Sequence, residues 1–158
     1  RQAEHIDLER FIELLIVANH VYICGNGGSA ANAMHMANDL ISANVRAHAL
    51  TADIATLTAI ANDFGYHYIF SRQLAAFGQP GDLLIVLSGS GNSENILQVL
   101  ASAQMMEIAS VAIVGGGDAA AEADYVMLTP GGMQAAEEEQ LRIGHAAMLR
   151  LKELRGQH

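Results

Sequence analysis

The sequence is poor in cysteine and in positive charge. Its single cysteine, Cys24, excludes an internal disulfide bond and a zinc site built from cysteines. Because Cys24 ends an apolar run, we interpret it as a small core residue rather than a nucleophile. Lysine and arginine together number 8 against 17 aspartates and glutamates, which gives a formal net charge of −9. No basic patch is present, so we expect no direct binding of nucleic acid, and an anionic ligand would depend on backbone N–H and hydroxyl groups.

Long hydrophobic runs and targeting signals are also missing. No uninterrupted apolar stretch reaches the length that crosses a membrane, and no signal peptide is visible. We therefore expect no membrane association and a cytoplasmic location. The sequence opens with Arg-Gln-Ala and no methionine, so we expect the natural protein to begin earlier, with its N-terminal helix truncated here.

The pattern of apolar residues predicts one α/β domain. The 158 residues are 51% hydrophobic, which is ample for a core. Strand-like and helix-like segments alternate, which indicates a doubly wound, mainly parallel sheet of about five strands flanked by helices. We expect strands at residues 21–24, 48–50, 83–87, 110–114 and 125–128, and helices at 3–18, 30–40, 57–61, 69–77, 94–106, 119–123 and 137–154.

A turn rich in serine and glycine connects the strand expected at 83–87 to the helix that follows it. Its sequence is Ser88-Gly89-Ser90-Gly91-Asn92-Ser93. A strand, a small turn and a helix in this order present N–H groups, hydroxyl groups and the positive end of a helix dipole to an anion. Ser93 also suits the N-cap of the helix. A plain turn that binds nothing is the alternative, but three serines and an asparagine favour a phosphate site.

A second glycine-rich turn, Gly25-Asn26-Gly27-Gly28-Ser29, follows the strand expected at 21–24 and leads into an alanine-rich helix. One such turn is weak evidence of a binding site, but two that both carry asparagine and serine are stronger evidence. Because parallel strands end at the same edge of a sheet, we expect both turns to line one crevice there.

Few other residues suit catalysis. His35 and Asp39 lie four residues apart on one helix face, which suits an acid/base pair or two ligands of one metal ion. An ordinary exposed histidine–aspartate pair has the same spacing. His145 lies among apolar residues of the last helix, where a buried or interface histidine is common. Asp63 is as consistent with a helix-ending turn as with a functional role.

In combination, these motifs resemble those of the phosphoheptose isomerases, which are sugar isomerase (SIS) domain proteins. The resemblance rests, in the same order through nearly the whole chain, on residues 25–31, His35, 57–63, 88–93 and Gly144-His145. It implies a single SIS domain of flavodoxin-like type over residues 1–158. It also implies conversion of sedoheptulose 7-phosphate to D-glycero-D-manno-heptose 7-phosphate through an enediol, in the synthesis of ADP-heptose and lipopolysaccharide core precursors. The implied assembly is a homotetramer with active sites at subunit interfaces, and no nucleotide cofactor is implied.

The resemblance also implies roles for individual residues. The residues implied to bind the phosphate are Ser88, Gly89, Ser90 and Ser93. The residues implied to make other contacts with the substrate are Asn26, Gly27, Ser29 and Asp63. Proton transfer falls to Asp39 and His145. Zinc is the implied cofactor, and its implied ligands are His35, Asp39, Glu137 and His145.

Two of these positions depart from the family pattern. The family has a glutamate where Asp39 stands and a glutamine where Glu137 stands. Aspartate has similar basicity but is one methylene shorter than glutamate. Glu137 and His145 would lie about 12 Å apart along one straight helix. Both can serve one metal ion only if Glu137 precedes the helix or if two subunits contribute.

Three alternative functions remain open at this point. The first is a non-catalytic tetrameric SIS protein that binds the bacterial replication initiator, because such proteins keep both turns without the full catalytic set. The second is a domain that senses a sugar phosphate for a regulator. The third is an isomerase that acts on a different sugar phosphate.

Overall fold

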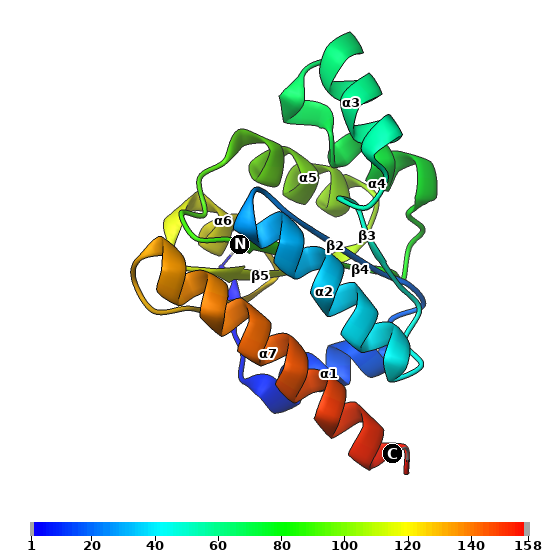
Figure 1. Ribbon diagram of the computed structural model, residues 1–158, viewed down its shortest axis with the longest axis vertical. Helices are drawn as coiled ribbons and strands as arrows, with labels where there is room; N and C mark the ends of the chain where they lie inside the picture. Colours follow the sequence, from blue (N-terminus) through cyan, green and yellow to red (C-terminus); the bar gives the residue numbers. More distant parts are fainter. Residues whose placement is uncertain (1, 157–158) are drawn as a thin grey trace.

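Six segments pair into one sheet in which every pair of neighbouring strands is parallel (Figure 1). The computed structural model describes residues 2–156, and the strand order across its sheet is β1-β6-β5-β4-β2-β3. The central strands are buried along their length, as expected of a parallel sheet covered on both faces. The strands are β1 (Glu4–His5), β2 (Val21–Gly25), β3 (Ala47–Ala49), β4 (Leu83–Ser88), β5 (Ala109–Val114) and β6 (Tyr125–Leu128).

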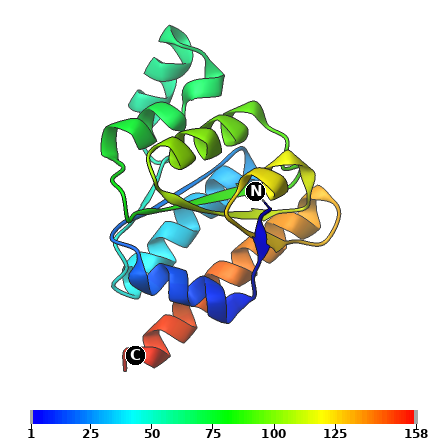
Figure 2. The same cartoon turned by 180° about the vertical axis from the view of Figure 1, so that it is seen from behind.

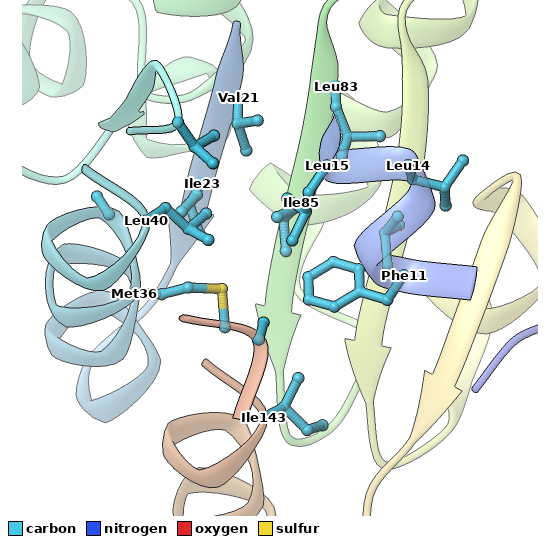
Figure 3. Packing of buried hydrophobic residues seen from close by; sticks show 14 of the residues in the cluster. Phe11, Leu14, Leu15, Val21, Ile23, Met36, Leu40, Leu83, Ile85 and Ile143 are labelled. Atoms are coloured by element: carbon cyan, nitrogen blue, oxygen red, sulfur yellow. The ribbon is translucent and has the colours of Figure 1, made fainter. Parts of the chain in front are cut away.

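Helices cover both faces of this sheet. They are α1 (Leu8–Val17), α2 (Gly28–Ser42), α3 (Ile54–Asp63), α4 (Ser71–Phe77), α5 (Glu94–Met105), α6 (Gly117–Glu122) and α7 (Met133–Leu154), with a short 3-10 segment, η1 (Tyr66–Tyr68). On one face, Phe11 of α1, Met36 of α2 and Ile143 of α7 converge on Ile23 and Ile85 of the central strands (Figure 3). A second cluster packs α4, α5 and α6 against the other face (Figure 2). No helix within residues 2–156 is both long and apolar enough to cross a membrane.

The N-terminal segment differs from the single helix expected over residues 3–18. Asp7 is the N-cap of α1, and its side chain accepts a hydrogen bond of 2.9 Å from the backbone N–H of Arg10. The helix therefore begins at Leu8. Glu4 and His5 pair with β6 instead and form a sixth strand, so the fold class is confirmed but the sheet has one strand more than expected. A strand of two residues is too short to show an alternating pattern.

The last helix begins four residues earlier than expected. The run of glutamates from residue 137 is typical of a helix start, but α7 begins at Met133, directly after Gly132 with its φ of +89°. Met133, Gln134 and the two alanines that follow form helices readily, so nothing prevents the helix from starting there. Glu137 consequently lies one turn inside α7.

The two glycine-rich turns lie side by side, as expected. The chain adds β3 on one side of β2 and its later strands on the other side, so the winding reverses between β2 and β4. Gly25 at the end of β2 pairs with Leu87 near the end of β4, which places both turns at this reversal point. Ligands of doubly wound sheets bind there. Near this edge, α3 projects away from the sheet in both views, and Ile60 is the one buried residue within it (Figures 1 and 2).

Candidate active site

Side-chain amides join the first turn to helix α5, which follows the serine-rich turn. Asn26 Nδ2 donates to Asn95 Oδ1 (2.8 Å), and Asn95 Nδ2 donates back to Asn26 Oδ1 (3.0 Å). The hydroxyl of Tyr66 also donates to Asn26 Oδ1 (3.0 Å). Because Asn95 is only 2% exposed, this pair is an internal bond between the first turn and α5. Asn26, which we expected to contact substrate, uses its amide for this bond, and sequence reasoning missed both of its partners.

The serine-rich turn is shaped by its own hydroxyl groups. Ser88 Oγ accepts a hydrogen bond from the N–H of Gly91 (3.0 Å), and Ser90 Oγ accepts one from the N–H of Asn92 (3.2 Å). Ser93 is the N-cap residue of α5, as expected, but its side chain makes no capping hydrogen bond. The first turn of α5 therefore presents N–H groups and the Ser93 hydroxyl that suit an anion.

His35, Asp39 and His145 come together where α2 and α7 run side by side (Figure 1). The Nε2 atoms of the two histidines are 2.9 Å apart. Asp39 Oδ1 lies 3.6 Å from His35 Nε2, and Asp39 Oδ2 lies 3.6 Å from His145 Nε2. The Asp39 side chain is 7% exposed, whereas the imidazoles are 47% and 45% exposed. A buried carboxylate thus supports two imidazoles that a substrate can reach.

This cluster fits a metal ion. One ligand atom from each of the three side chains lies within 4.8 Å of the others. Asp39 Oδ2 is buried without a hydrogen-bond partner among the described residues, which is costly for a carboxylate unless a cation offsets its charge. Two imidazoles and one carboxylate are also the donor set of catalytic zinc sites that keep a fourth position open.

Glu137, the fourth expected ligand, lies elsewhere within this chain. Because α7 is continuous, the eight-residue step from Glu137 to His145 spans about 12 Å along its axis. The Glu137 carboxylate instead lies against Gly28, where a Cβ would collide with it. α2 has neither a side-chain cap nor an acidic residue in its first turn, so Glu137 supplies the negative charge at its positive end.

Gln140 connects α2 and α7 near the cluster and was missed from the sequence. It is fully buried, and its Oε1 accepts hydrogen bonds from Ser29 Oγ (3.1 Å) and Asn32 Nδ2 (3.0 Å). Ser29, which we expected to contact substrate, is itself 3% exposed and belongs to this internal network. The signal that could have found Gln140 is its spacing from the buried residues Ala136 and Ile143, which puts it on the apolar face of α7.

The hydrogen bond of the Asp63 side chain stays within helix α3. Asp63 is the last residue of α3, and its Oδ1 accepts a hydrogen bond from Asn62 Nδ2 (3.0 Å). With Phe64 and Arg72 it lines a cavity of about 260 Å³ between α3 and α4. This cavity is separate from the two beside the glycine-rich turns, and the contact between Asp63 and substrate stays a prediction.

Two cavities open beside the turns. One, of about 250 Å³, lies between the first turn and α3 and has a mainly apolar lining. The other, of about 420 Å³, reaches the start of α5 and is lined by Asn26, Tyr66, His67, Ser93, Glu94 and Asn95. The second cavity places polar side chains around the end of the serine-rich turn, as a small phosphorylated ligand requires.

Cys24 ends its apolar run inside the core. It is fully buried, and this burial raises the pKa of its thiol. Because the thiolate is the nucleophilic form of cysteine, the thiol is inert near neutral pH. This agrees with the interpretation of Cys24 as a core residue.

Comparison with known proteins identifies the family. A profile of the SIS domain matches residues 9–115. A phosphoheptose isomerase from Akkermansia muciniphila is 39% identical over 142 residues, covering 84% of this chain and 75% of that protein. One from Sulfurimonas denitrificans is 43% identical over 132 residues, covering 78% of this chain and 68% of that protein. The chain belongs to the phosphoheptose isomerase family of SIS domain proteins.

A solved structure agrees with this assignment. The phosphoheptose isomerase from Neisseria gonorrhoeae superposes with a TM-score of 0.86 at 32% identity, covering 91% of this chain and 84% of that one. The SIS-type α/β fold is confirmed, and the chain is a phosphosugar isomerase. The family therefore places the turns and the histidine–aspartate cluster in an enzyme that acts on phosphorylated sugars.

Proposed function

We propose that this SIS protein converts sedoheptulose 7-phosphate to D-glycero-D-manno-heptose 7-phosphate through an enediol, in the route to ADP-heptose and the lipopolysaccharide core. The observation that carries the proposal is the cluster of His35, Asp39 and His145 on helices α2 and α7. The first glycine-rich turn leads directly into α2, and the serine-rich turn is its neighbour. The names of the relatives support the seven-carbon substrate.

The phosphate belongs to the serine-rich turn rather than to the first turn. The Glu137 carboxylate already lies at the start of α2, and it would repel a phosphate there. The start of α5 has no side-chain cap, and the N–H groups and hydroxyls around Ser88, Gly89, Ser90 and Ser93 suit the anion. Gly27 and the backbone of the first turn then remain for the hydroxyl groups of the sugar.

Proton transfer falls to Asp39 and His145. The enediol route moves a proton between C1 and C2 of the sugar and also moves protons between their oxygens. The half-exposed imidazole of His145 exchanges these protons with the substrate, because substrate can reach it. The buried Asp39 carboxylate adjoins that imidazole and shares the proton transfers with it.

Zinc fits this proposal as a cofactor. His35, Asp39 and His145 would hold the ion, and Asp39 is long enough to approach both imidazoles although it is shorter than a glutamate. A zinc ion bound there supplies Lewis-acid polarisation of the hydroxyl and carbonyl oxygens of the sugar. Glu137 takes no part in this set within one chain.

A homotetramer with active sites at subunit interfaces completes the proposal. Leu141, His145 and Leu149 follow one another at four-residue spacing, so exposed leucines flank the imidazole on one face of α7. Asp63 ends the projecting helix α3, and in this proposal it contacts a substrate bound to another subunit.

The test is to incubate the purified protein with sedoheptulose 7-phosphate, with and without zinc, and to follow aldose formation by NMR. We expect turnover, and we expect His145→Ala to lose two to four orders of magnitude in kcat/KM, as for a lost general acid or base. Near-normal turnover in His145→Ala removes this residue from the mechanism. Binding of the sugar phosphate without turnover would favour a non-catalytic SIS protein, and turnover of another phosphosugar would correct the substrate.

A further inference from the structure

We propose that His67 and Glu94 set the affinity of the serine-rich turn for phosphate, with the Glu94 carboxylate opposing the anion and the protonated His67 imidazole offsetting that carboxylate. The inference rests on the proposed function, because it takes the serine-rich turn as the phosphate site. It concerns two residues to which no role has been assigned so far.

His67 and Glu94 lie at the end of the serine-rich turn. Glu94 is the first residue of α5 and directly follows Ser93. Its Oε2 lies 2.8 Å from Nε2 of His67, which comes from η1. Both side chains line the cavity of about 420 Å³ together with Ser93. A ligand in that cavity therefore meets this pair beside the N–H groups of α5.

The charge of Glu94 is unfavourable to a bound phosphate. A carboxylate in the first turn of a helix interacts well with the helix dipole, so it competes with an anionic ligand for the same positive end. At physiological salt, charges within about 8 Å of each other are incompletely screened, and the residue next to Ser93 lies in that range of a phosphate on the turn.

A protonated His67 offsets most of the repulsion between the Glu94 carboxylate and a bound phosphate. Among the residues that line the two cavities at His67, Glu94 is the one other carboxylate or cation. Asp63 and Arg72, on the neighbouring helices α3 and α4, line a different cavity. The side chains of the pair are 61% and 71% exposed, and ion pairs with such exposure contribute little to stability. The effect of the pair therefore falls on the ligand rather than on the fold.

The experiment titrates inorganic phosphate into wild type, Glu94→Gln, His67→Gln and the double variant by calorimetry. All four titrations are run at pH 6.0. We expect Glu94→Gln to tighten phosphate binding about three- to fivefold and His67→Gln to weaken it by a similar factor. The double variant should match Glu94→Gln, because His67 acts through Glu94. Both effects should shrink in 0.5 M salt, which a purely structural role would not produce.

Glu107→Gln is the matched control, because it removes the same charge from an exposed site just beyond the other end of α5. Its phosphate affinity should equal that of wild type. An unchanged affinity in Glu94→Gln overturns the inference, as does a loss from His67→Gln that persists when Glu94 is already replaced. If wild type binds neither phosphate nor a sugar phosphate, the proposed function itself fails, and this outcome is separate from the other two.

Discussion

The proposed chemistry depends on Asp39, a single buried carboxylate between two imidazoles. Its spacing from His35 is visible in the sequence, because four residues make one helix turn. The contact with His145, more than a hundred residues away, follows from the packing of α7 on α2 and could be expected only from the family resemblance. Gln140 and Asn95 were missed because their partners come from other elements, so no local pattern marks them.

At this scale we predict that Asp39→Asn loses zinc affinity by at least about tenfold, because an amide lacks the charge that offsets the cation. Glu137→Gln should bind zinc as wild type does, since Glu137 lies against Gly28. Competition with a chromophoric chelator measures both affinities without any assay of activity. An equal loss in the two variants would make Glu137 a ligand, supplied by a neighbouring subunit.

Elements were predictable where a side chain or a glycine marks their ends. The turns after β2 and β4 were recognised from glycine and serine, and in the structure Asp53, a residue type favoured at this position, caps α3. The start of α7 and the two-residue strand β1 were not predictable in the same way. The start of α7 depends on residues that allow a helix but do not mark where it begins. Strand β1 depends on pairing with a strand more than a hundred residues later.

The serine-rich turn should be sensitive to any side chain at Gly91. This residue has a φ of +70°, and a Cβ there would collide with the backbone carbonyl oxygen of Gly116. We predict that Gly91→Ala lowers the free energy of unfolding by at least about 2 kcal/mol, since the left-handed conformation alone costs roughly 1–2 kcal/mol. Urea denaturation measures the change. Gly131→Ala is the control, because a Cβ at Gly131 has open space. Equal stability of the two variants would contradict the prediction.

On the scale of the whole molecule, the exposed leucines of α7 bear on assembly. We predict that wild type is a tetramer by size-exclusion chromatography with light scattering. Leu149→Glu should shift it to smaller species and reduce isomerase activity, because a carboxylate would be buried at the interface. Met105→Glu, at an exposed site on the opposite face of the sheet, should leave the mass unchanged. A monomeric wild type would contradict the proposed interface.

Cys24 links the stability of the whole fold to pH. Its pKa is raised by burial, so the folded protein keeps the thiol protonated where the unfolded chain ionises. Its contribution to the free energy of unfolding is complete below the pKa of an unfolded thiol, about 8.5. This contribution is lost progressively as pH rises above that value. Above that value, we predict that the free energy of unfolding of wild type falls by about 1.4 kcal/mol more per pH unit than that of Cys24→Ala. Urea denaturation between pH 8 and 10 with reductant tests this, and parallel curves for the two proteins would contradict it.

The two outer strands of the sheet are its shortest strands. β1 has two residues and β3 has three, whereas the inner strands have four to six. An edge strand is the place where a sheet recruits another chain through unpaired backbone groups, and fibrils grow in this way. Edges this short offer a passing chain only one or two hydrogen bonds in register. The protein can thus contain a strongly apolar sheet with little risk of fibrillar aggregation, and we expect its copies to associate through their helices.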